Sequence, residues 1–126
     1  MQLSQARPSI LIVDEDQSVR TGLCRLLAIH GYQTYQADSH ASALVEVEIR
    51  QPDVVIIDLH LTASSGLEIA RSIKRDTQLP KTRLIALSAT IPEWDEAMGI
   101  FEHVLGKPCL ADDLLAAIDC AKRAHS

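Results

Sequence analysis

The sequence is poor in aromatic residues and in long apolar runs. One Trp, two Tyr and one Phe make up 3% of its 126 residues, so a core has to be built from aliphatic side chains. No apolar run approaches the roughly 20 residues that cross a bilayer, which predicts no membrane span. The net charge of −5 argues against direct binding to nucleic acid, because that binding needs clustered Lys and Arg to displace counterions.

Cysteines are also few, and their spacing is uninformative for a metal or redox motif. Cys24, Cys109 and Cys120 are an odd number without a C-x-x-C pair, which favours reduced thiols over a disulfide framework. The N-terminus lacks the basic and then apolar pattern of a secretory signal. We therefore expect a cytoplasmic protein, and the length predicts a single domain over residues 1–126.

The apolar residues that are present form short runs separated by helical patterns. Four runs suit strands buried on both faces of a parallel sheet, namely Ile10–Val13, Val54–Ile57, Leu84–Leu87 and Val104–Leu105. A fifth, Gln33–Ala37, alternates and suits a strand nearer the edge. Helical spacing fills residues 19–30, 41–48, 66–75, 92–99 and 112–123. This (βα)5 order predicts an α/β fold, with a doubly wound, five-stranded parallel sheet in a three-layer sandwich.

Polar side chains follow the ends of four of these strands, where doubly wound sheets bind their ligands. They are Asp14, Glu15 and Asp16, then Asp58, then Ser88, and finally Lys107. Carboxylates held close together repel unless a cation neutralises them, and Mg²⁺ prefers oxygen ligands. Lys107 and Ser88 could bind an anion next to the Mg²⁺ ion, the lysine through its positive charge and the serine through a hydrogen bond. The combination predicts phosphoryl chemistry on a carboxylate.

Four motifs carry a family resemblance. In this order and spacing, "ILIVDED", "VVIIDLHL", "LIALSA" and "VLGKPC" resemble the receiver domain of bacterial two-component response regulators, the chemotaxis-receiver-like superfamily. The likeness covers about residues 9–122, which leaves residues 1–8 as a flexible N-terminal extension. It implies a flavodoxin-like sheet with strand order 2-1-3-4-5.

The resemblance also implies a role for each matching residue. Asp58 would be the phosphoacceptor, with Ser88 and Lys107 contacting the phosphoryl group. Mg²⁺ (or Mn²⁺) would be held by Asp14, Glu15, Asp58 and the backbone carbonyl of His60. Gly66 matches the glycine of the loop after the acceptor strand. The positions expected to tune or report phosphorylation are His60, Thr90 and Val104.

As a receiver, the chain would take its phosphoryl group from a sensor histidine kinase or a histidine phosphotransfer protein in a two-component phosphorelay. It would be no enzyme beyond catalysing its own phosphorylation and dephosphorylation. Its output would come from an output domain or a protein partner. The family also uses the face made by the fourth helix, fifth strand and fifth helix for partners, and a homodimer through this face is a further expectation.

Several residues depart from the family pattern. Thr62 stands where a proline is usual, Val104 where the family has a switching aromatic or histidine, and Leu110 where the last helix usually has an acidic N-cap. The segment from Ser88 to Lys107 is about one helical turn short. These changes predict an intact phosphorylation site and an altered output face.

Three other functions are open on the sequence. "DEDQS" also resembles the start of a haloacid-dehalogenase-like phosphohydrolase, with Asp14 as nucleophile and Asp16 as general acid. A flavodoxin-like FMN binder would share the sheet, but carboxylates after the first strand would repel its phosphate. A receiver-like interaction module that works without phosphorylation is the third alternative.

Overall fold

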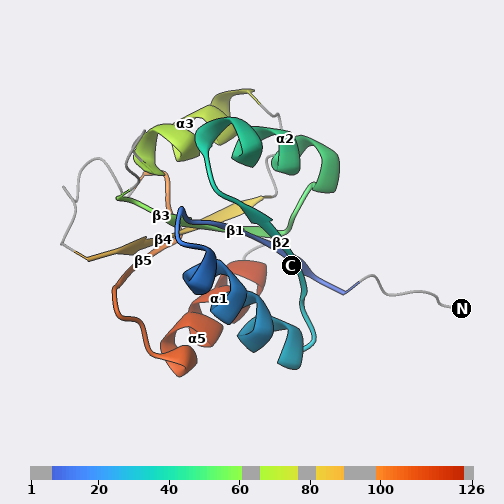
Figure 1. Ribbon diagram of the computed structural model, residues 1–126, viewed down its shortest axis with the longest axis vertical. Helices are drawn as coiled ribbons and strands as arrows, with labels where there is room; N and C mark the ends of the chain where they lie inside the picture. The colour runs from blue at the N-terminus through green and yellow to red at the C-terminus, as the bar shows by residue number, and fades with distance from the viewer. Residues whose placement is uncertain (1–6, 61–65, 77–81, 90–98, 124–126) are drawn as a thin grey trace, which may run out of the picture.

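The computed structural model describes residues 7–60, 66–76, 82–89 and 99–123 (Figure 1). Its elements are β1 (Ser9–Val13), α1 (Gln17–Ile29), β2 (Gln33–Ala37), α2 (His40–Arg50), β3 (Val54–Asp58), α3 (Gly66–Asp76), β4 (Arg83–Ser88), β5 (His103–Gly106) and α5 (Ala111–Arg123). The five strands are parallel and lie in the order β2-β1-β3-β4-β5, which confirms the predicted fold. The helix predicted at 92–99 falls almost entirely outside the described residues, as does most of the extension predicted at 1–8.

The central strands are buried on both faces. Helices α1 and α5 cover one face of the sheet and α2 and α3 the other (Figure 1). Along β1, Ile10 and Ile12 pack in the first of these layers, whereas Leu11 and Val13 pack in the second. A strand with two covered faces needs apolar side chains at successive positions, which accounts for the unbroken run in the sequence.

The helix boundaries follow from local capping. Asp16 is the N-cap of α1, where its side chain accepts hydrogen bonds from the backbone N–H groups of Ser18 and Val19. Ser39 forms a capping box with Ser42 at the start of α2. Gly31, with φ of 90°, turns the chain after α1 as its sequence position predicted. No helix within the described ranges is long and apolar enough to cross a membrane.

Gly66 begins α3 at a point of very close backbone approach. A Cβ atom on this residue would overlap the backbone carbonyl oxygen of Asp58 and would lie 2.8 Å from Cα of Leu59 and 2.9 Å from Cγ2 of Ile57. The Gly66 N–H also donates to the carbonyl of Leu59. Because backbone atoms cannot move aside as a flexible side chain can, only glycine fits here. Gly66 thereby fixes α3 against the end of β3.

We expect Gly66→Ala to lower the free energy of unfolding by about 1–3 kcal/mol, the usual cost of overpacking. Gly22→Ala is the matched control, because a Cβ on Gly22 in α1 meets nothing within 4 Å. That control should stabilise the protein by roughly 0.5–1 kcal/mol through helix propensity. Urea unfolding of both variants measures the two changes, and equal effects would contradict the close approach at Gly66.

Candidate functional site

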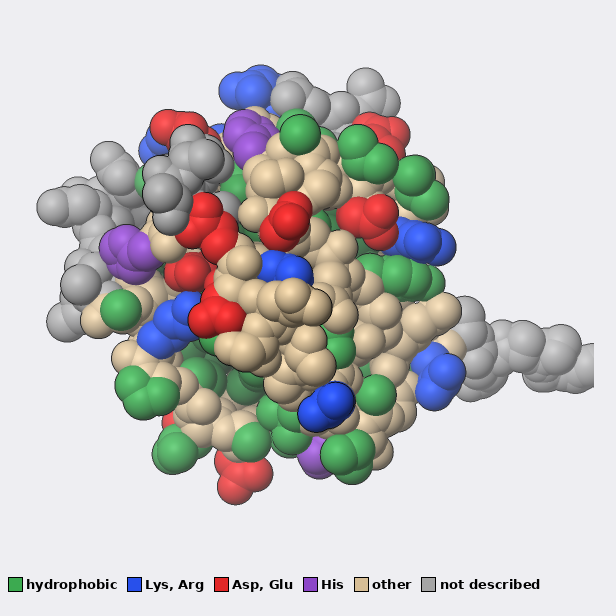
Figure 2. All heavy atoms as spheres, in the orientation of Figure 1, with side chains coloured by type: hydrophobic (Ala, Val, Ile, Leu, Met, Phe, Trp, Pro, Cys, Tyr) green, Lys and Arg blue, Asp and Glu red, His purple; other side chains and the backbone are tan. Residues whose placement is uncertain are grey.

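The site begins with two buried carboxylates on neighbouring strands. Val13 of β1 pairs with Ile57 of β3, so the residues that follow them, Asp14 and Asp58, come to the same edge of the sheet. Their exposed fractions are 3% and 8%. Acidic side chains, with basic ones between them, gather on the face of the molecule seen in Figure 2. Two buried carboxylates at one strand edge need a positive partner.

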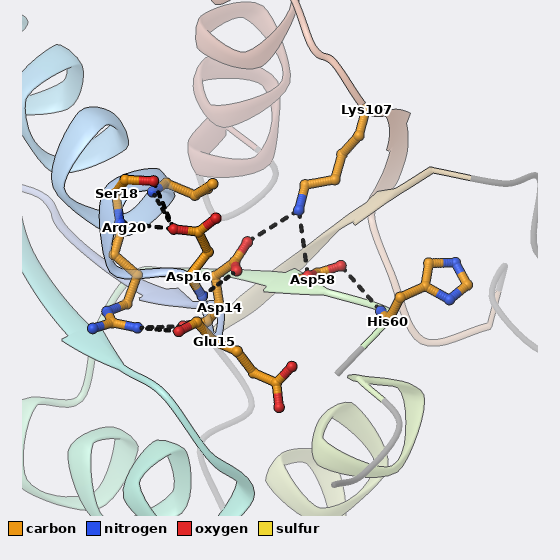
Figure 3. Close-up of polar contacts among 9 residues, drawn as sticks. Asp14, Glu15, Asp16, Ser18, Arg20, Asp58, His60 and Lys107 are labelled. Atoms are coloured by element: carbon orange, nitrogen blue, oxygen red, sulfur yellow. Dashed lines mark hydrogen bonds and ion pairs between the residues drawn. The ribbon is translucent and has the colours of Figure 1, made fainter. Parts of the chain in front are cut away.

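Lys107 is that partner. Its Nζ lies 3.1 Å from Oδ2 of Asp14 and 3.3 Å from Oδ2 of Asp58 (Figure 3). Lys107 follows β5, two strands away from Asp58, and its backbone N–H donates to the carbonyl of Ser88. The peptide bond from Lys107 to Pro108 is cis. The sequence therefore correctly predicted that Asp14, Asp58 and Lys107 meet.

The pKa of Lys107 reflects two opposing effects. Burial lowers this pKa, but the hydrogen bond to Asp14 and the negative charges of Asp14 and Asp58 outweigh burial and raise it above its ordinary value of 10.5. The ammonium group is therefore charged at neutral pH. One lysine balances only one of the two carboxylates, so this trio keeps a net charge of −1.

The loop between β1 and α1 holds Asp14 in place through contacts that the sequence did not reveal. Oδ1 of Asp14 accepts a hydrogen bond from the backbone N–H of Asp16 at 2.9 Å. The Arg20 guanidinium donates to the carbonyl oxygens of Asp14 and Glu15, at 2.7 and 3.1 Å (Figure 3). It also donates to Oε1 of Gln36. Nothing in the sequence sets Arg20 apart from Arg25 on the same helix. Arg20 thus ties this loop to β2.

Glu15 and Asp16 follow Asp14 in the same loop, but their carboxylates point in other directions. The Glu15 side chain is exposed and points away from Asp14 and Asp58 in Figure 3. Asp16 is occupied as the α1 cap, and hydrogen bonds from the side chain and backbone of Ser18 and from the backbone of Val19 lower its pKa. Within the described ranges, no three His, Cys, Asp or Glu side chains group as metal ligands. Of the predicted metal ligands, Asp14 and Asp58 are together and the Glu15 carboxylate is not.

His60 contacts both Asp58 and Ser88. The backbone N–H of His60 donates to Oδ1 of Asp58 at 3.0 Å, and Nε2 of His60 lies 3.0 Å from Oγ of Ser88. Ser88 ends β4 and is 2% exposed, whereas the His60 side chain is exposed. Val104 is half-buried on β5 and packs against the α2–α3 layer. Thr90 and Thr62 lie outside the described residues.

Known proteins of one family resemble this chain. The response regulator receiver domain family matches residues 10–119. The KDP operon transcriptional regulatory protein KdpE of Escherichia coli is 31% identical over 121 residues, which cover 94% of this chain and 52% of that protein. The acid tolerance regulatory protein ActR of Rhizobium meliloti is 34% identical over 116 residues, covering 87% and 57%. The chain spans about half the length of the curated relatives it matches.

Solved structures agree with these sequence matches. A receiver domain from Methylobacillus flagellatus has a TM-score of 0.84 and 25% identity, covering 92% of this chain and 99% of that one. A receiver domain from Clostridium thermocellum has a TM-score of 0.82 and 29% identity, covering 94% and 96%.

We expect Lys107→Met to lower the free energy of unfolding at neutral pH by about 1–3 kcal/mol, because two carboxylates lose a charged donor. The pKa of Lys107 is raised on folding, so its contribution is fully present below pH 10.5 and is lost as pH rises through the raised pKa. Urea unfolding over a pH series should show that the difference in free energy of unfolding between wild type and Lys107→Met becomes smaller at alkaline pH. Lys74 is exposed and provides the control: Lys74→Met should have nearly the same free energy of unfolding as wild type at every pH.

Proposed function

The chain belongs to the response regulator receiver domain family, and from that premise we propose that Asp58 accepts a phosphoryl group from a sensor histidine kinase or a histidine phosphotransfer protein. The observation that carries the proposal is the shared contact of Lys107 with Asp14 and Asp58. This contact brings the proposed nucleophile Asp58, the second carboxylate Asp14 and the ammonium group of Lys107 together at one edge of the sheet.

In the proposed reaction an oxygen of Asp58 attacks the phosphorus of a phosphohistidine. The new P–O bond forms as the P–N bond breaks, and the departing imidazole takes up a proton. The Lys107 ammonium, already 3.3 Å from Asp58, balances the charge of the phosphoryl oxygens. Ser88, buried at the end of the neighbouring strand, supplies a hydroxyl. Positioning and charge stabilisation account for most of the help that proteins give such transfers.

Mg²⁺ (or Mn²⁺) fits the donor chemistry of this edge. Asp14 and Asp58 offer two buried carboxylates whose charge Lys107 only half balances, and hard divalent ions prefer such oxygens together with water. In our proposal these two residues hold the ion with the backbone carbonyl of His60, and Glu15 joins after its side chain rotates. When bound, the ion neutralises negative charge on the phosphoryl oxygens.

As a receiver, the chain catalyses only its own phosphorylation and dephosphorylation and acts on no other substrate. Phosphorylation would shift the balance between two conformations and so change the affinity for an output domain or protein partner. The family model and the named regulators among the relatives support a place in two-component signalling. The expected setting is the cytoplasm.

The rival phosphohydrolase is less well supported by the contacts of Asp16. That enzyme would use Asp14 as nucleophile and Asp16 as general acid. A general acid at neutral pH needs a raised pKa, whereas hydrogen bonds from Ser18 lower the pKa of Asp16. The same carboxylate caps α1.

Acetyl phosphate and Mg²⁺ should add one phosphoryl group to the wild-type chain and none to Asp58→Asn, as measured by intact mass. Asp53→Asn is the matched control, because Asp53 precedes β3 at the opposite end of the strand. It should be phosphorylated like wild type. An adduct that persists in Asp58→Asn and disappears in Asp14→Asn would favour the hydrolase, and no adduct on wild type would favour a phosphorylation-independent module.

Arg20→Met should raise the Mg²⁺ concentration needed for half-maximal phosphorylation, by about tenfold, as loss of groups that orient metal ligands does elsewhere. The reason is that Arg20 fixes the backbone of Asp14 and Glu15. Arg25→Met removes an exposed arginine from the same helix and should leave that concentration unchanged. Equal Mg²⁺ dependence in all three proteins would show that Arg20 does not position the site.

A further inference from the structure

His60 connects the phosphoacceptor residue to the buried hydroxyl. Its backbone N–H binds Oδ1 of Asp58, and its ring nitrogen Nε2 lies 3.0 Å from Oγ of Ser88. The ring itself turns away from Asp58 in Figure 3. One residue therefore contacts both the carboxylate that would be modified and the hydroxyl beside it, through two different groups.

Strand β5, the next strand after Ser88, carries Val104 at the position where the family usually has an aromatic residue or a histidine. It therefore has no ring there that could bind Ser88 as the His60 ring does. The Val104 side chain packs with the aliphatic layer under α2 and α3 and has no polar atom with which to bind a hydroxyl. Val104 pairs with Ala86, two residues before Ser88. A change at the Ser88 hydroxyl therefore cannot be passed to Val104 through a side-chain hydrogen bond.

We propose that the His60 imidazole reports the phosphorylation of Asp58, by binding the Ser88 hydroxyl in the unmodified protein and releasing it when the phosphoryl group arrives. This inference rests on the proposed function. It assigns to His60 a positioning role for Ser88, exerted from the loop after β3.

The chemistry of the phosphoryl group favours this exchange. It carries up to two negative charges on three strong acceptor oxygens, in place of the single charge of the Asp58 carboxylate. Hydrogen bonds to such oxygens are roughly twice as strong as those between neutral groups. If Ser88 donates to Nε2, the phosphoryl oxygens compete for that hydroxyl proton. If Nε2–H donates instead, the Ser88 oxygen accepts and its own O–H can still donate to the phosphoryl oxygens. The proposed release therefore belongs to the tautomer in which Nε2 accepts.

The release would change the surface of the protein. His60 is exposed whereas Ser88 is buried, so the ring transmits an event at a covered hydroxyl to a position that a partner can reach.

The histidine ring nitrogens can be followed by ¹⁵N NMR at one fixed pH, in the apo protein, with Mg²⁺ alone, and with Mg²⁺ and acetyl phosphate. His60→Ala assigns the signal. We expect the His60 Nε2 signal to move on phosphorylation and to move in the same direction in unphosphorylated Ser88→Ala, while Ser88→Thr, which keeps the hydroxyl, retains the wild-type signal. The contact between His40 Nε2 and Ser72 Oγ, at 3.1 Å, provides the matched control. Ser72→Ala should move His40 and leave His60 in place.

Intact mass of the same samples separates the two proposals. A phosphoryl adduct with an unmoved His60 signal would overturn the reporter role and leave the proposed function standing. No adduct on wild type would refute the proposed function, and the reporter role would fall with it. Movement of the His60 signal with Mg²⁺ alone, and no further movement on phosphorylation, would assign the change to the metal and also overturn the inference.

His60→Ala should increase steady-state phosphorylation about fivefold, the effect of removing one ordinary competing hydrogen bond, and His40→Ala should not.

Discussion

The contact of one lysine with two buried carboxylates is the constraint on which the rest of this site depends. Asp14 and Asp58 meet because β1 and β3 are parallel neighbours in register, so their polar ends cannot be separated without breaking the sheet. Lys107 reaches them from β5, across the end of β4. Since the lysine balances only one negative charge, the edge remains attractive to a further cation. The proposals of a divalent ion at this edge and of phosphoryl transfer to Asp58 both rest on that imbalance.

The sequence was sufficient for the fold and for the residues at strand ends, because both depend on simple periodicity. Unbroken apolar runs marked β1, β3 and β4, and parallel strands bring their carboxyl ends to one edge whatever the side-chain details. The sequence did not predict in which direction each side chain points after the strand ends. Asp14 faces Lys107, and its neighbour Glu15, in the bend that leads to α1, faces away. The contacts of Arg20 and of the His60 ring depend on loop geometry, which periodicity does not encode.

Two departures from the family pattern, Leu110 and Val104, can be followed in the structure. Leu110 is 71% exposed and has no side-chain acceptor for the first N–H groups of α5, yet the helix forms with Asp112 and Asp113 in its first turn. Negative charge there favours the helix dipole without an acidic cap. Val104 similarly fills aliphatic space on β5 without a polar function. Neither Leu110 nor Val104 takes part in the ion pairs that join Lys107 to Asp14 and Asp58.

The hydrogen bonds around Asp58 in the unmodified protein decide which neighbouring residues the proposed phosphorylation would displace. Oδ1 of Asp58 is bound by the His60 backbone, Oδ2 by Lys107, and the Ser88 hydroxyl by the His60 ring. A phosphoryl group on Asp58 would therefore meet groups that already have partners, and its own contacts would have to replace theirs. Replacement, unlike simple addition, obliges neighbouring residues to move. A densely bonded site is for that reason better suited to switching than an open one, because it can convert one new charge into a rearrangement.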